Sequence, residues 1–280
     1  MDQKYLLLGH SGFIGKSIKK HFNNNGIPIA CVGRDTIDLE NEQSIKQLTD
    51  IILPNMNIII TAGIKRQLGD NAANLGRNNQ ITRNISMALS KSPPSHLLYL
   101  SSAAVYGEDK PFATPIDENT DFDPGSYYAE AKTNAEKVLR KASVDCGFPA
   151  CFVRPPLVYG AGDKSKGYGP TGFCFNAFHN QTVEVWGDGT EKREFVWIDD
   201  LGSICSQLSV EKIPGPVNSV SGVSRSFIEI IEILEKKMNR RVLRKKKKRT
   251  KKKVDHIFSH RNACSIIKNF KFTPLEKGLE

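Results

Sequence analysis

Short apolar runs alternate with amphipathic segments along the first 154 residues of the chain. Buried strands are expected at the apolar runs 4–8, 27–32, 57–61, 96–101 and 150–153. Helices are expected where apolar residues recur with helical spacing, near 13–22, 42–49, 74–90 and 127–146. Such alternation predicts an α/β fold with a Rossmann-type, doubly wound parallel sheet of five strands.

The alternation ends after Arg154, where a glycine-rich stretch begins. An amphipathic stretch follows at 173–178, and a strongly amphipathic helix is expected at 226–238. We therefore expect two unequal parts. Residues 1–160, with 195–212 returning to them, would form the Rossmann domain, and residues 161–194 and 213–280 would form a smaller, substrate-binding C-terminal portion.

Three glycines, Gly9, Gly12 and Gly15, follow the first expected strand and open the first expected helix. Without side chains at these positions, backbone N–H groups and the positive end of the helix can approach a pyrophosphate. A glycine-rich turn without a ligand is the alternative. The position at a strand-to-helix junction favours a dinucleotide cofactor.

The end of the second expected strand bears on the choice between NAD and NADP. An acidic residue there holds the ribose 2′-hydroxyl of NAD, whereas a basic residue suits the additional phosphate of NADP. Here Gly33 stands at the acidic position and Arg34 follows it, which favours NADP. Asp35 is close enough to serve the ribose of NAD if the strand ends later, and Arg34 as a plain surface residue is the alternative.

Tyr128 and Lys132 are four residues apart, so they share one face of the expected helix. An ammonium beside a phenol stabilises the phenolate, as a general acid or base requires. The spacing alone is common on exposed helices. Ser102, however, follows a strand at the edge of the sheet where ligands bind, and it could donate a hydrogen bond to a substrate oxygen.

With these groups in place, five motifs resemble the extended short-chain dehydrogenase/reductase family, in its nucleotide-sugar epimerase, dehydratase and reductase branch. They are the glycine turn 9–15, Leu100-Ser-Ser-Ala-Ala-Val-Tyr-Gly107, Tyr128-x-x-x-Lys132, Arg154-Pro-Pro-Leu-Val-Tyr-Gly160 and the stretch 187–200. The resemblance implies that Ser102 and Tyr128 contact the reacting sugar oxygen and Lys132 the nicotinamide ribose. It implies that Arg193 holds a nucleotide diphosphate, for which its bidentate fork is suited.

Taken together, the residues and the resemblance predict three sets of site residues and no metal ligands. The catalytic set is Ser102, Tyr128 and Lys132. The cofactor set is Gly9, Gly12, Phe13, Ile14, Gly15, Arg34, Asp38, Leu39, Ala62, Gly63, Asn79, Tyr128, Lys132 and Pro155. The substrate set is Ser102, Ala103, Tyr128 and Arg193. The resemblance places Asn79 behind the nicotinamide, and Asp38 and Leu39 beside the adenine. Plainer alternatives are Asn79 as a turn cap, Asp38 as a solvated acid, and Arg193 as a partner of Glu191 or Asp199.

Two departures from the family pattern narrow the reaction. Sugar 4,6-dehydratases follow their serine or threonine with an Asp-Glu pair, and GDP-fucose synthases place a cysteine two residues after the serine. Ala103 and Ala104 stand here, and neither can transfer a proton. What remains is hydride transfer at one carbon of a nucleotide sugar, as a 4-epimerase or a 4-keto reductase using NADP or NAD. A reductase of a non-sugar carbonyl and a dinucleotide-binding regulator without turnover are the alternatives.

The distribution of charge adds expectations about binding partners. Nine of the ten residues from Arg244 to Lys253 are Lys or Arg, which accounts for nearly all of the net charge of +10. An exposed strand or loop is the plain interpretation of this basic run, and salt-sensitive attraction to an anionic surface is the functional one. A specific nucleic-acid partner is not expected, because basic residues are not spread over a docking face.

The remaining expectations concern location and assembly. No stretch has the length of a membrane span or a signal peptide core, and the six cysteines form no zinc-binding spacing. A cytoplasmic protein is therefore expected. The family resemblance implies a homodimer.

Overall fold

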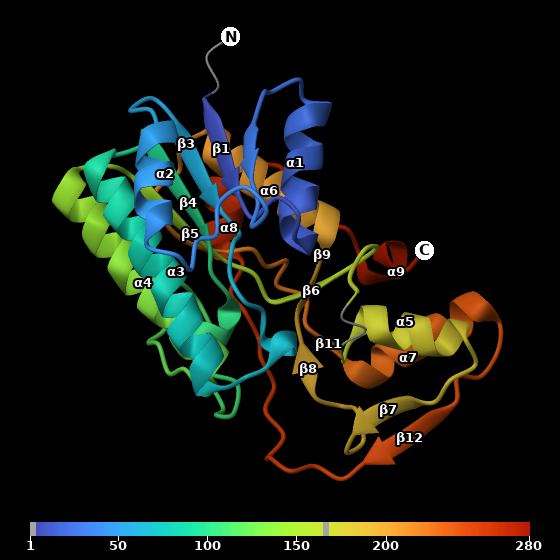
Figure 1. Ribbon diagram of the computed structural model, residues 1–280. Coiled ribbons are helices and arrows are strands. Elements are labelled where there is room, and N and C mark those ends of the chain that lie inside the picture. Colours follow the sequence, from blue (N-terminus) through green and yellow to red (C-terminus); the bar gives the residue numbers. More distant parts are fainter. Residues whose placement is uncertain (1–3, 165–167) are drawn as a thin grey trace.

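A six-stranded parallel sheet forms the centre of the larger part of the molecule. The computed structural model describes residues 4–164 and 168–280 (Figure 1). The strand order is β10-β5-β4-β3-β1-β2. The strands are β1 (Tyr5–Leu8), β2 (Ala30–Val32), β3 (Asn57–Ile60), β4 (His96–Leu100), β5 (Ala150–Arg154) and β10 (Gly215–Asn218). All five pairings in this sheet are parallel, so the carboxyl ends of the strands lie along one edge.

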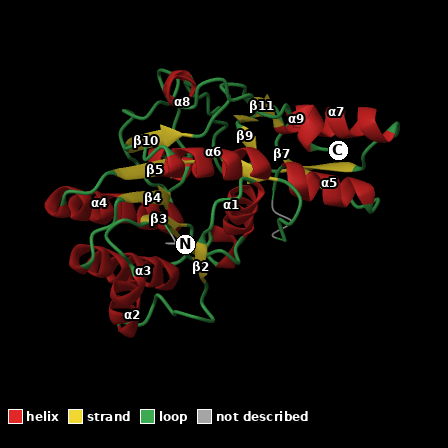
Figure 2. Cartoon of the chain, turned by 90° about the horizontal axis from the view of Figure 1, so that it is seen from above, coloured by secondary structure: helices red, strands yellow, loops and turns green. Residues whose placement is uncertain are grey.

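Helices cover both faces of the sheet, which is why β3, β4 and β5 are buried at every position instead of alternating. The helices α2 (Gln43–Ile51), α3 (Ala72–Lys91) and α4 (Tyr127–Cys146) cover one face. The other face carries α1 (Phe13–Asn24) and α6 (Ile198–Val210), with the short α8 (Arg261–Ile266) beside β10 (Figure 2). This arrangement confirms the predicted α/β class and Rossmann-type sheet.

The smaller part has a core of its own, built from helices and short strand pairs. Its elements are α5 (Pro170–Phe178), β7 (Val183–Trp186), β8 (Lys192–Arg193), β11 (Arg225–Ser226), α7 (Phe227–Met238), β12 (Arg244–Lys247) and α9 (Leu275–Gly278). The strand β6 (Leu157–Tyr159) pairs with β9 (Phe195–Trp197) where the chain crosses between the two parts. The predicted amphipathic helix is α7, which begins with a capping box between Ser226 and Glu229.

Two sequence expectations need correction. The sheet has six strands instead of five, because β10 adds parallel to β5. Residues 213–280 therefore do not belong wholly to the smaller portion, since Val217 and Ile267 pack into the core between the sheet and α6. The physical reason is that β10 is a four-residue edge strand containing Pro216, too short for a recognisable pattern.

No helix in the described ranges is both long and apolar enough to cross a bilayer.

Candidate active site

A cavity of about 630 Å³ opens at the edge of the sheet where the parallel strands end. Its wall includes the glycine turn, the loop after β3, the end of β4 and the first turns of α4. The lining residues include Gly12, Phe13, Ile14, Gly15, Gly63, Ser102, Tyr128, Lys132 and Pro155. Most of the residues predicted to hold a cofactor or to react therefore meet in one place.

The glycine turn is packed too tightly for any side chain at two of its positions. A Cβ on Gly15 would lie 2.3 Å from the carbonyl oxygen of Gly9, and one on Gly9 would lie 2.6 Å from the amide nitrogen of Ala62. Gly9 also has a φ of +93°, which L side chains avoid. The Thr61 hydroxyl is within 3.1 Å of the Leu8 and Gly9 carbonyls. Because α1 begins directly behind the turn, its free N–H groups face the cavity as a pyrophosphate cradle would require.

Ser102, Tyr128 and Lys132 come together from β4 and α4. Ser102 follows β4 and caps the 3-10 helix η2 (Ala103–Tyr106), with its Oγ accepting from the Ala104 N–H at 3.2 Å. Tyr128 stands in the first turn of α4, which Ser126 caps. Lys132 lies one turn further, where its Nζ donates to the Leu100 carbonyl at 2.7 Å and contacts the Tyr99 hydroxyl at 3.2 Å. The end of β4 thus supports both Ser102 and Lys132.

Burial shifts the proton equilibria of this trio. The pKa of Tyr128 is raised by burial, and a hydrogen bond with Ser102 acts in the opposite direction. The pKa of Lys132 is lowered by burial to about 8, with the Glu136 carboxylate opposing that shift. An ammonium with a pKa near neutrality and a phenol beside it are the components of a proton-transfer site.

A buried polar network behind the site holds β4, β5 and α4 in register. Glu136 and Arg154 are 1% and 2% exposed and form a bidentate pair, with contacts of 3.0 and 2.7 Å. The Ser101 hydroxyl donates to the same carboxylate at 2.5 Å. Arg154 also donates to the Tyr106 hydroxyl at 2.7 Å. Because Ser101 precedes Ser102, this network fixes the end of β4 from the core side.

The residues expected around the adenosine half lie at the end of β2, outside the cavity lining. Leu39 is buried, and its carbonyl accepts from the Asn84 side chain at 2.9 Å. The guanidinium of Arg34 lies 3.2 Å from Glu40 and 3.8 Å from Asp38. Glu40 was not among the predicted residues. The guanidinium of Arg77 donates to Glu40 at 2.7 and 2.8 Å. Two guanidinium groups and two carboxylates therefore neutralise one another in this cluster.

Asn79 and its neighbour Asn78 divide their contacts between α4 and the loop after β3. Asn79 accepts a hydrogen bond of 3.4 Å from Asn134 of α4 and does not line the cavity. Asn78, which the sequence analysis missed, bonds the backbone of Ile64 through both its oxygen and its nitrogen, at 2.7 and 3.1 Å. It thereby fixes the loop that continues from Ala62 and Gly63. Only the packing of α3 reveals which asparagine does this.

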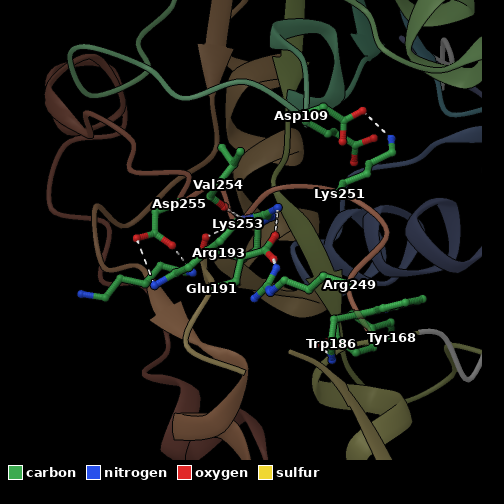
Figure 3. A network of polar contacts seen from close by, with 12 residues as sticks. Asp109, Tyr168, Trp186, Glu191, Arg193, Arg249, Lys251, Lys253, Val254 and Asp255 are labelled. Carbon is green, nitrogen blue, oxygen red and sulfur yellow. Dashed lines mark hydrogen bonds and ion pairs between the residues drawn. The ribbon is translucent and has the colours of Figure 1, made fainter. Parts of the chain in front are cut away.

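Arg193 lies in a second, smaller cavity of about 70 Å³ beside Ser102. Its guanidinium is mostly buried, pairs with Glu191 and donates to the carbonyls of Lys192 and Val254 at 2.8 and 2.5 Å. Burial lowers the pKa of Arg193. The other oxygen of Glu191 binds Arg249, so one carboxylate joins two guanidinium groups (Figure 3). Sequence reasoning missed Arg249 because it lies inside the basic run, 56 positions after Arg193.

Two further titratable groups border the small cavity and were also missed. Glu194 is 1% exposed. One of its oxygens accepts from the Gly222 N–H and the Ser221 hydroxyl, both at 2.9 Å, while Oε2 has no partner in the described residues. Burial raises the pKa of Glu194 and lowers that of His256 to about 4. Ala103 lines the same cavity.

Asp199 and Asp200 lie in the first turn of α6 and have separate structural contacts. Asp199 accepts from Lys20 of α1 at 2.8 Å. Asp200 accepts from the backbone N–H and hydroxyl of Thr273 at 2.6 and 2.9 Å. Among the described residues, no group of three His, Cys, Asp or Glu side chains is placed to hold a metal ion.

A parallel sheet with a glycine cradle and a Ser-Tyr-Lys trio at its edge defines a Rossmann-type dinucleotide enzyme. The comparison with protein families is more specific. The chain belongs to the NAD dependent epimerase/dehydratase family, whose pattern matches residues 5–218.

Two plant proteins are similar to this chain in sequence. The GDP-L-fucose synthase 1 of Arabidopsis thaliana is 25% identical over 251 residues, which cover 83% of this chain and 77% of that protein. The probable GDP-L-fucose synthase 1 of Oryza sativa subsp. japonica is 27% identical over 216 residues, 71% of this chain and 65% of its own length.

The same overall fold occurs in MoeE5 in complex with UDP-glucuronic acid and NAD, with a TM-score of 0.85 and 21% identity over 99% of this chain and 96% of that one. It occurs again in the Thermus thermophilus UDP-glucose 4-epimerase complex with NAD, with a TM-score of 0.82 and 16% identity over 98% of this chain and 96% of that one.

Proposed function

We propose that the protein transfers a hydride between a nicotinamide dinucleotide and one carbon of a nucleotide sugar, as a 4-epimerase or a 4-keto reductase. The observation that carries the proposal is the convergence of Ser102, Tyr128 and Lys132 with the glycine turn on one cavity. The tight approach of Gly9 to Ala62 and of Gly15 to Gly9 supports a cradle for the dinucleotide pyrophosphate.

In this mechanism Tyr128 exchanges the proton of the reacting sugar hydroxyl. The bound nicotinamide would supply or accept the hydride. Ser102 holds the sugar oxygen in reach of the phenol, and the Lys132 ammonium stabilises the phenolate and is placed to bind a ribose hydroxyl. Lys132 is held in position by the Leu100 carbonyl, 2.7 Å from its Nζ.

The nucleotide diphosphate is assigned to Arg193 and Arg249. Both guanidinium groups are bound to Glu191, and Arg193 lines the small cavity beside Ser102. A diphosphate would compete with Glu191 for their N–H groups, with the planar fork geometry that favours arginine over lysine.

The identity of the dinucleotide separates the two reactions. An epimerase retains NAD through its cycle, whereas a reductase must exchange its cofactor. Arg34 favours NADP, but its pairing with Glu40 and Asp38 places two carboxylates where an added phosphate would bind. Both dinucleotides therefore stay in the proposal. Denaturing the purified protein and identifying the released dinucleotide decides between them, and tightly held NAD would contradict the reductase.

The proposed chemistry is tested by Tyr128→Phe, which removes one hydroxyl and keeps the ring. We expect turnover of nucleotide sugars to fall by about 100-fold to 10,000-fold, with dinucleotide binding retained. Unchanged turnover would exclude Tyr128 as the acid–base group. A wild-type protein that binds the dinucleotide but turns over no nucleotide sugar would favour the regulator without catalysis. Arg193→Ala separates sugar nucleotides from other carbonyl substrates, because only a diphosphate-bearing substrate would show a raised Michaelis constant.

The proposed homodimer would form through α3 and α4, where Met87 and Val138 are exposed.

A further inference from the structure

The basic run, residues 244–253, forms the outer rim of the smaller part of the molecule. Its first four residues form β12, which is exposed at every position and pairs with β7 in a two-stranded sheet. Figure 1 shows β12 and β7 at the end of the smaller part furthest from the parallel sheet. The positive charge of the chain is therefore concentrated on one projecting edge.

Most of this charge is not neutralised by the protein itself. Arg249 turns inward to Glu191 and belongs to the site described above. Carboxylate partners exist for three lysines, with pairs Lys247–Glu184, Lys251–Asp109 and Lys253–Asp255. Within the described ranges, the other basic residues of the run form no ion pair; these are Arg244, Lys245, Lys246, Lys248 and Lys252.

Two large apolar side chains project beside this edge. Phe178, the last residue of α5, is 75% exposed, and Leu243, directly before β12, is 59% exposed. Arg240 connects the segment before β12 to the end of α5, because its guanidinium donates to the Ala177 carbonyl at 2.7 Å and also bonds Asn180. The carbonyl of Leu243 accepts from the N–H of Val183 at 2.7 Å. The end of α5 and the start of β12 therefore form one corner.

We propose that this corner and the basic run bind the surface of an anionic lipid bilayer. Lysines and arginines near such a surface are attracted by its negative potential. Exposed aromatic and aliphatic side chains beside them gain by entering the boundary between headgroups and acyl chains. A nucleic acid would satisfy the charges but offers no apolar phase for Phe178 and Leu243. The protein would bind peripherally, through one edge.

Membrane binding of this kind does not depend on the chemistry at Tyr128. An experiment can therefore refute the membrane proposal without refuting the proposed hydride transfer, and the reverse. The test uses the full chain with vesicles of phosphatidylcholine containing a quarter phosphatidylglycerol and with vesicles of phosphatidylcholine alone. We expect co-sedimentation with the anionic vesicles only, and much weaker binding at about 1 M salt, where screening acts over about 3 Å.

Two variants locate the surface. The triple variant Lys245→Gln, Lys246→Gln, Lys248→Gln should bind anionic vesicles about 100-fold more weakly. The matched control Lys91→Gln, Lys137→Gln, Lys268→Gln removes the same charge from exposed lysines on the Rossmann domain and should bind normally. Phe178→Ser should weaken binding at every salt concentration. Both the triple variant and its control should turn over a water-soluble substrate normally.

Three results would overturn the proposal. One is the absence of binding to anionic vesicles, and another is equal binding by the triple variant and the wild-type protein. The third is release from the vesicles by an equal phosphate concentration of single-stranded RNA, which would identify a nucleic-acid surface instead.

Discussion

The ammonium of Lys132 lies 5.9 Å from the centre of the Tyr128 ring, on the same face of α4. The stabilisation of the phenolate that we propose for Lys132 would therefore act through space. The same ammonium is anchored to the strand below through Leu100. In the proposed mechanism, Lys132 therefore couples the Tyr128 phenol to the end of β4, and its protonation state would affect catalysis.

The pH dependence of the reaction should follow that coupling. The Lys132 ammonium is present below its pKa of about 8 and is lost as pH rises through that value. Because the ammonium stabilises the Tyr128 phenolate, we expect kcat/KM for the nucleotide sugar to fall above pH 8. A pH profile over roughly pH 6 to 10 measures this. A rate that instead rises through pH 8 would show that forming the phenolate is limiting and that the lysine charge is not needed.

Gly15→Ala should disrupt the dinucleotide cradle. Its Cβ would lie 2.3 Å from the Gly9 carbonyl oxygen, so the turn must move. We expect dinucleotide affinity to fall by at least about tenfold and stability by about 1–3 kcal/mol. Fluorescence titration with NADH and NADPH and urea unfolding measure the two effects. Normal affinity in this variant would exclude the turn as the pyrophosphate site.

Gly76→Ala is the matched control for that substitution. Gly76 lies within α3, and a Cβ there meets nothing within 4 Å. Alanine in place of glycine inside a helix should stabilise the protein by about 0.5–1 kcal/mol. Dinucleotide affinity should stay unchanged, since this residue is exposed and is not part of the cavity lining.

The substitution His256→Asn tests whether the small cavity beside Ser102 contains a second proton-transfer group. With a pKa lowered to about 4, His256 is neutral at physiological pH. For simple hydride transfer at one carbon, we expect the Michaelis constant to rise and kcat to change by less than about tenfold. Steady-state kinetics with the same nucleotide sugar measure both. A fall in kcat of about 100-fold or more would instead assign acid–base chemistry to this histidine.

Glu136→Ala should be strongly destabilising. The substitution leaves the Arg154 guanidinium, 2% exposed, without its carboxylate partner. Removing one member of a buried ion pair costs about 3–5 kcal/mol. Urea unfolding measures the loss. Glu130→Gln, at an exposed acid of the same helix, should change stability by less than about 1 kcal/mol. Similar losses in the two variants would show that the buried network is not what holds α4 to β5.

Local sequence patterns were sufficient for the order of strands and helices up to Arg154. They also predicted that the glycine turn, Ser102, Tyr128 and Lys132 meet at one edge of the sheet. The reason is that each of these rests on short-range rules. Apolar runs predict strands, a four-residue spacing predicts a shared helix face, and residues that follow parallel strands meet at one edge of the sheet. The trio could be placed because β4 and α4 follow these rules closely.

Only the tertiary structure decided which distant segments meet. The addition of β10 to the sheet, the sharing of Glu191 by Arg193 and Arg249, and the closure of a small cavity by Glu194 and His256 join segments far apart in the sequence. Such contacts depend on how whole elements pack, since no local spacing encodes them. Isolated charged residues look alike in a sequence, and burial with a specific partner is what distinguishes Arg249 from the lysines beside it.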